Sequence, residues 1–195
     1  MKKRYAKIMP RAGLAMLLIL VIPAVRSMME SDMALHMLLQ FPLVLLAGWL
    51  LAKGFSEQTR TRLQSWNHSG ISGLLMVTMV LMFWMIPRAL DLVLIDHTME
   101  LWKFLSLAMA GAALELSWQA AGMIVRGFFL GNVLPMMMVA GWLYVEAPVR
   151  ICNAYLTNDQ LRTGSGLLAL AIAGSLIWLY AFFMPAERKS NGEAL

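Results

Sequence analysis

Residues 33–52 read MALHMLLQFPLVLLAGWLLA, twenty residues without a single Asp, Glu, Lys or Arg. A helix of that length is about 30 Å long, which is the thickness of the hydrocarbon core of a bilayer. Five further stretches repeat the pattern in whole or in large part: residues 12–25, 71–90, 99–118, 127–145 and 165–184. The sequence therefore predicts an all-α polytopic membrane protein, with about six transmembrane helices in one bundle.

The composition supports a membrane protein. Of the 195 residues, 60% are hydrophobic and only 14% are charged, whereas an ordinary soluble domain has about 25% charged residues. This excludes a soluble enzyme, a disordered chain and a nucleic-acid-binding domain. We expect a single domain over residues 1–195, with a basic N-terminal segment (1–11) and a polar C-terminal tail (186–195). The first apolar stretch could also be a signal peptide or a signal anchor, but no cleavage site stands out after it.

Lysine and arginine residues predict the orientation of the chain. With the N-terminus inside the cell, eleven of them fall on the cytoplasmic side and five on the outer side. Because cytoplasmic loops carry the excess of positive charge, both termini are expected in the cytoplasm of a bacterial inner membrane. The longest cytoplasmic link, residues 54–70, mixes basic and aromatic residues and is predicted to contain an interfacial helix.

Possible metal ligands gather at the outer side of this topology. His36 lies near the start of the second apolar stretch, His97 just before the fourth and Met85 near the end of the third. Imidazole and thioether ligands suit copper(I), so we predict a copper site of His36, His97 and Met85. Three acids nearby are candidates to orient the imidazoles: Asp32, Asp96 and Glu100. Interfacial histidines are more often hydrogen-bonding residues than ligands, and that interpretation stays open.

Other patterns carry weaker predictions. Four methionines spaced by three (Met76, Met79, Met82 and Met85) form either a thioether ladder or pliable packing. Glu115 and Arg126 are expected to pair across a short turn, because unpaired charges in a membrane are costly. The single cysteine, Cys152, excludes an intramolecular disulfide and is expected to be semi-buried. There is no phosphate loop, nucleophile elbow or zinc-protease pair, so we do not expect an enzyme.

Four motifs, in order over about residues 33–183, resemble the caa-type cytochrome c oxidase assembly factors (the CtaG family). His36-Met37-Leu38-Leu39-Gln40 before Pro42 resembles the family's His-Met-x-x-His…Pro. Trp84-Met85-Ile86-Pro87…Asp91 resembles Trp-His-x-Pro…Asp, and residues 97–101 resemble His-x-x-Glu-His. Asn158-Asp159-Gln160-Leu161 resembles Asp-Gln-Gln-Leu, and the resemblance suggests that Asp159 and Gln160 cap the last helix at the outer surface.

This chain departs from the family pattern at three histidine positions, which hold Gln40, Met85 and Leu101. The resemblance implies an inner-membrane accessory protein for copper delivery to, or assembly of, a cytochrome c oxidase-type respiratory complex. Its partners would be oxidase subunits or a periplasmic copper carrier, besides the lipid bilayer.

Two alternatives remain open in which the chain is a subunit of a membrane electron-transfer complex. One is a subunit that binds haem b or a quinone, with His36 and His97 as the axial ligands of a haem. The other is a structural subunit without a cofactor. A transporter is a fourth possibility, although no broken inverted-repeat helices are evident.

Overall fold

The computed structural model describes residues 2–147 and 150–190, and within these ranges it describes side chains for residues 8–183. The chain is 86% helical, with no strand among the described residues, which confirms the predicted all-α membrane bundle. The elements in chain order are α1 (Lys2–Val21), α2 (Pro23–Glu30), the π-helix η1 (Leu35–Gln40), α3 (Phe41–Ala52), α4 (Glu57–Trp66), α5 (Ile71–Trp84), α6 (Pro87–Ile95), α7 (His97–Ala120), α8 (Met123–Glu146) and α9 (Thr157–Ser190).

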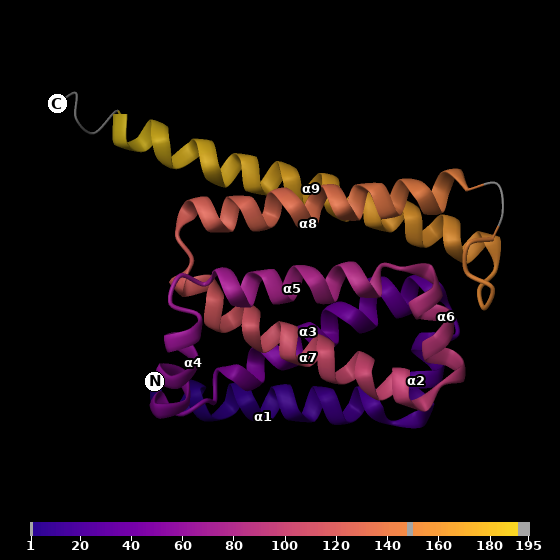
Figure 1. Ribbon diagram of the computed structural model, residues 1–195, viewed down its shortest axis with the longest axis horizontal. Coiled ribbons are helices and arrows are strands. Elements are labelled where there is room, and N and C mark those ends of the chain that lie inside the picture. The colour runs from indigo at the N-terminus through magenta and orange to yellow at the C-terminus, as the bar shows by residue number, and fades with distance from the viewer. Residues whose placement is uncertain (1, 148–149, 191–195) are drawn as a thin grey trace.

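The long helices lie roughly side by side (Figure 1). Helices α2 and α6 lie at one end of the bundle, which we call the α6 end, and α4 lies at the opposite end, the α4 end. Helix α1 begins and α9 finishes towards the α4 end, so the chain enters and leaves the bundle on the same side. The α8–α9 hairpin flanks the other helices along α5 (Figure 1).

Three helical segments are long and apolar enough to cross a membrane: Leu35–Ala52, Met123–Glu146 and Thr157–Phe183. The count rises to five if each of two bent pairs is one span, namely α1 with α2, bent by 72°, and α4 with α5, bent by 83°. The remaining expected stretch, residues 99–118, lies in α7, whose 24 residues span about 36 Å. Helix α7 is less apolar because it carries Glu100, Lys103 and Glu115.

The prediction that residues 71–90 form one continuous spanning helix is wrong. Helix α5 ends at Trp84 and α6 begins at Pro87. Ile86, the residue before the proline, has an extended ψ of 123°, because the proline ring disfavours a helical conformation there. The chain therefore turns at this point and places α6 across the α6 end of the bundle (Figure 1).

Helices α3 and α7 cross closely at two glycines. A Cβ on Gly48 would lie 1.9 Å from the carbonyl oxygen of Ala108, and one on Gly111 would lie 1.9 Å from that of Leu45. Small residues allow such close backbone approach between membrane helices. The crossing holds the first turns of α7 against the π-helix η1, where the polar side chains of the candidate site meet.

Candidate functional site: a buried polar cluster around Lys103

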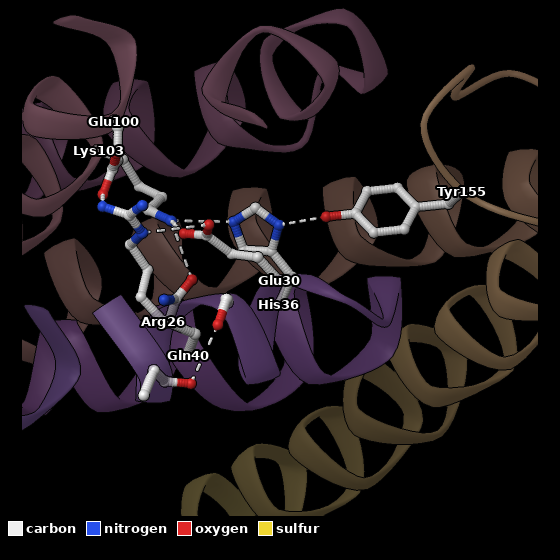
Figure 2. A network of polar contacts seen from close by, with 9 residues as sticks. Arg26, Glu30, His36, Gln40, Glu100, Lys103 and Tyr155 are labelled. Carbon is white, nitrogen blue, oxygen red and sulfur yellow. Dashed lines mark hydrogen bonds and ion pairs between the residues drawn. The ribbon is translucent and has the colours of Figure 1, made fainter. Parts of the chain in front are cut away.

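Lys103 lies in the second turn of α7, and its side chain is 0% exposed. Its Nζ donates to Glu30 Oε1 at 2.5 Å and to Gln40 Oε1 at 3.0 Å, and lies 3.2 Å from His36 Nε2. These three acceptors come from α2 and η1 and match the three N–H bonds of an ammonium group, whereas a neutral amine has only two. Lys103 is therefore bound as a cation by three buried acceptors (Figure 2).

His36 connects Lys103 to the loop between α8 and α9. Because Nε2 accepts from the ammonium, the neutral ring carries its proton on Nδ1, which donates to the hydroxyl of Tyr155 at 2.7 Å. Burial raises the pKa of Tyr155, with smaller contributions from nearby acids, so its hydroxyl stays neutral. His36 thus lies between Lys103 and Tyr155 with both ring nitrogens in hydrogen bonds (Figure 2).

Further ion pairs surround this centre. Arg26 forms an ion pair with Glu100 of α7, and its Nε lies 3.7 Å from Glu30 Oε2 in the same helix, α2. Two cations and two carboxylates therefore alternate as Glu100, Arg26, Glu30 and Lys103 (Figure 2). The formal charges of these four residues cancel, which is the condition under which buried charges are tolerated.

The local sequence explains why His36 and Gln40 face Lys103 together. Pro42 has no N–H and cannot donate to the carbonyl of Leu38, as the α-helical pattern would require. Just before it, the Phe41 N–H bonds the carbonyl of His36, five residues back, and residues 35–40 form a π-helix. Residues 36, 37 and 40 of this segment are all buried, so both polar side chains lie on its inner face. π-helical turns frequently occur at functional sites.

The structure places the three predicted ligands in different surroundings. His36 is fully buried in the cluster, whereas His97, the first residue of α7, is exposed. Met85 caps α5 and packs against the hydrophobic core, and its carbonyl accepts from the hydroxyl of Tyr144 at 3.1 Å. No hydrogen bond joins any two of these three side chains among the described residues.

Copper(I) does not fit between His36 and Gln40 in this arrangement of the side chains. The position between His36 and Gln40, where the family pattern has two ligands, holds the ammonium of Lys103. A cation there excludes a metal ion by repulsion, and both His36 nitrogens are already in hydrogen bonds. Within the described part of the chain, no group of three or more His, Cys, Asp or Glu side chains could hold a metal ion; this finding does not concern a ligand set that includes Met85.

The three acids predicted to orient imidazoles have other partners. Asp32 accepts from the backbone N–H of Ala34 at 2.7 Å, and Asp96 caps α7 by accepting from Thr98 N at 2.8 Å. Glu100 pairs with Arg26. The residues that form hydrogen bonds with the His36 imidazole are instead Lys103 and Tyr155.

The predicted Glu115–Arg126 pair is wrong. Glu115 lies at the α4 end with its side chain 2% exposed, and it pairs with Lys53 at 3.3 Å and Arg60 at 3.2 Å. Arg126 stacks over the ring of Trp118 at 5.3 Å. The Arg60 pair therefore connects α4 to α7, and the Lys53 pair connects the end of α3 to α7.

Helix α4 agrees with the predicted interfacial helix. It lies within residues 54–70, has no buried residue and makes an angle of 83° with α5. Trp66 at its end is 85% exposed. A bend of this size and the absence of buried residues are what a helix along the membrane surface would show, whereas the alternative is a bent span made of α4 and α5.

The predicted cap at the start of the last helix agrees with the structure in part. Helix α9 begins at Thr157, but it is one long helix rather than a short one. Gln160 is buried, accepts from Ile151 N at 2.9 Å and donates to the carbonyl of Tyr144 at 3.1 Å. Gln160 therefore joins α8, α9 and the loop between them. The predicted tail overlaps α9, which extends to Ser190, and residues 191–195 lie outside the described part.

Cys152 lies in the same loop and is fully buried rather than semi-buried. The loop is held to α6 by Asp91, which accepts from the backbone N–H groups of Asn153 and Ala154 at 2.9 and 3.1 Å. Burial, with a smaller contribution from Asp91, raises the pKa of the Cys152 thiol to about 12. A protonated, buried thiol is unreactive and a poor metal ligand.

The methionine series on α5 does not lead into the bundle. Met79 is 56% exposed and Met82 is 49% exposed, so this part of the series faces outward. In a membrane these side chains contact lipid, which is consistent with the packing interpretation.

Comparisons of the chain with protein-family models, curated proteins and solved structures found no match. The arguments on function therefore depend on the cluster and on the sequence motifs. Sequence reasoning missed the roles of Lys103, Arg26 and Tyr155: it counted Lys103 and Arg26 among the five cations of the outer side, and it considered Glu30 only as a possible metal ligand near His36. The available signal was a lysine within an apolar stretch, with Glu100 three residues before it, and the pair Arg26 and Glu30, four residues apart, before the preceding apolar stretches.

Proposed function

We propose that this chain is a cofactor-free accessory protein of the bacterial inner membrane that serves the assembly or structure of a cytochrome c oxidase-type respiratory complex. Two arguments support this proposal. The order of four sequence motifs resembles the oxidase assembly factors, and the chain's own ammonium group takes the position where such a factor would bind metal.

The position of Lys103 is the observation that carries the proposal. Its Nζ contacts His36 and Gln40, the two residues aligned with the first ligand pair of the family pattern. An ammonium group forms hydrogen bonds with the same kinds of nitrogen and oxygen atoms that ligate metals, and it needs no external supply. The cluster therefore binds a cation, which is the chain's own ammonium group, and this group links several segments inside the bundle.

That link joins four segments at the α6 end. Lys103 and Glu100 belong to α7, Glu30 and Arg26 to α2, His36 to η1, and Tyr155 to the α8–α9 loop. Buried charged networks of this kind leave few alternative arrangements, since any shift leaves a charge unpaired. The link therefore fixes the positions of α2, η1, α7 and the α8–α9 loop relative to one another, which is the role expected of a structural subunit.

Copper delivery remains the competing proposal, with a periplasmic copper carrier as partner. It requires Lys103 to leave the cluster and His97 and Met85 to approach His36. The two proposals therefore make opposite predictions for His97 and Met85, which the cofactor-free account does not use.

Complementation distinguishes the two proposals. A strain lacking the protein should recover oxidase assembly and oxidase copper content with the double variant His97→Ala/Met85→Leu, as with the wild type. Met85→Leu nearly conserves core volume, and His97 is exposed, so the fold is retained. The variant Lys103→Met, which disrupts the cluster, should fail to complement. If the His97→Ala/Met85→Leu variant folds but leaves the oxidase without copper, the cofactor-free proposal is wrong.

We further propose that the α4 end faces the cytoplasm and that both termini lie there. The support is the excess of lysine and arginine on that side, which remains when Lys103 is assigned to the bundle interior. A reporter fused after residue 195 should give a cytoplasmic signal, and one inserted after Asn153 a periplasmic signal. The reverse pattern would overturn the orientation.

A further inference from the structure

The exposed face of α8 carries polar groups halfway along a membrane span. Gly131, Asn132 and Pro135 are all exposed. Helix α8 runs from Met123 to Glu146, so Asn132 lies about 4 Å from its midpoint at 1.5 Å per residue. We call these three residues the Asn132 notch.

The hydrogen bonds of the notch are incomplete within the chain. Asn132 Nδ2 donates to the carbonyl of Phe128 at 2.8 Å, which uses one of its two N–H bonds. The second N–H and Oδ1 have no partner among the described residues. Pro135 lacks an N–H, so the carbonyl of Gly131 loses the donor that a helix normally supplies. The notch therefore offers an amide donor, an amide acceptor and a carbonyl acceptor.

The surroundings of the notch are apolar. Above and below it on the same exposed face lie Ile124, Phe128, Val139 and Trp142, which are 88%, 74%, 64% and 60% exposed. Helix α8 qualifies as a membrane span, and only 11% of its most apolar window is buried inside the bundle. Hydrocarbon satisfies no hydrogen bond, so unpaired polar groups at this depth favour contact with another polar group.

The notch also has room for a second helix. No atom lies within 4 Å of the position that a Cβ on Gly131 would take, so the helix backbone is open on that side. Glycine at such a position permits close backbone approach, as in other membrane helix pairs. The one charged residue between positions 124 and 142 is Arg126, which is partly buried and stacks over the ring of Trp118. The exposed face around Asn132 therefore carries no charge, and two identical faces do not repel each other.

We propose that the Asn132 notch binds the same notch of a second copy of this chain, giving a dimer with two-fold symmetry. A two-fold axis brings identical patches together, so each patch must complement itself. The notch meets that condition, because the free N–H of one Asn132 can donate to Oδ1 or to the Gly131 carbonyl of the other copy. If the helix presented only donors or only acceptors, two identical faces could form no hydrogen bond with each other, and all of these groups would stay unsatisfied.

The test is self-association of the full chain in liposomes, measured by energy transfer between labelled copies at decreasing protein-to-lipid ratios. The wild type should dimerise, and Asn132→Leu should raise the dissociation constant about tenfold, because both copies lose their amide contact. The matched control is Thr78→Val on α5, which removes a membrane hydroxyl already bonded to the carbonyl of Leu74 at 3.0 Å. This control should dimerise like the wild type.

Cross-linking identifies the face that pairs. In a Cys152→Ala background, Val139→Cys should be joined into dimers by a short bis-maleimide, whereas Ile177→Cys on the outer face of α9 should not. A monomeric wild type, an Asn132→Leu variant that dimerises as tightly as the wild type, or equal cross-linking at residues 139 and 177 would each overturn the proposal.

Discussion

Replacing Lys103 with methionine should lower the free energy of unfolding by about 3–5 kcal/mol, the range found when one partner of a buried ion pair is removed. The structure gives the reasons for so large an effect. The substitution removes the donor to Glu30, Gln40 and His36 at once, in a place where Lys103 is 0% and Glu30 is 9% exposed. The remaining charged partner of the Glu30 carboxylate is Arg26 at 3.7 Å.

A double-mutant cycle separates the ion pair from packing. Glu30→Gln removes the charge that Lys103 neutralises, so the double variant Lys103→Met/Glu30→Gln should be more stable than the sum of the single effects implies. Residues in one buried network typically couple by about 0.5–3 kcal/mol. The measurement is reversible unfolding in mixed micelles with increasing denaturing detergent, followed by circular dichroism.

The matched control is Lys53→Met, at the opposite end of the bundle. Lys53 also pairs with a carboxylate, Glu115, at 3.3 Å, but its side chain is 25% exposed and Arg60 remains beside the same carboxylate. Lys53→Met should therefore lower the free energy of unfolding by less than about 1 kcal/mol. If Lys103→Met costs no more than Lys53→Met, or if the Lys103 and Glu30 substitutions add without coupling, the ammonium-centred cluster is refuted.

Three further predictions follow from other contacts. Tyr155→Phe removes the acceptor of the His36 Nδ1–H and should cost about 1–3 kcal/mol in the same unfolding measurement, whereas an unchanged stability would contradict the assigned tautomer. Glu115→Gln should release α4, seen as faster motion of a spin label at position 63, while an immobile label would show that other contacts hold α4. Because burial raises the pKa of Cys152 from 9.0 to about 12, the stability it contributes is complete below about pH 9 and is lost as the pH rises towards 12. The difference in stability between the wild type and Cys152→Ala should therefore change across that pH window and stay constant below it.

The helical membrane architecture could be predicted from the sequence because apolar runs near twenty residues identify spanning helices directly. The break at Pro87 was signalled by the proline and by Arg88 after it, but Ala89 and Leu90 are apolar and allowed the predicted span to be extended to residue 90. The interfacial helix was predictable from its mixture of basic and aromatic residues between two apolar stretches.

The polar cluster depends on contacts between residues 60 to 120 positions apart, which no local pattern contains. Sequence reasoning singled out His36 and Gln40 through their spacing, but the partner of both is Lys103, two turns into another helix. A lysine close to the end of an apolar stretch is ordinarily assigned to the membrane surface, where its long side chain reaches water. Here the close crossing at Gly48 and Gly111 holds it against η1 instead.

Copper(I) binding to the purified protein tests the central claim most directly, namely that an ammonium group takes the place of a metal in this cluster. The measurement is competition with a chromophoric copper(I) chelator, applied to the wild type and to His36→Ala/His97→Ala. The account predicts that the wild type withdraws no more copper(I) from the chelator than the double variant does. One equivalent of copper(I) held by the wild type and lost in the double variant would contradict it.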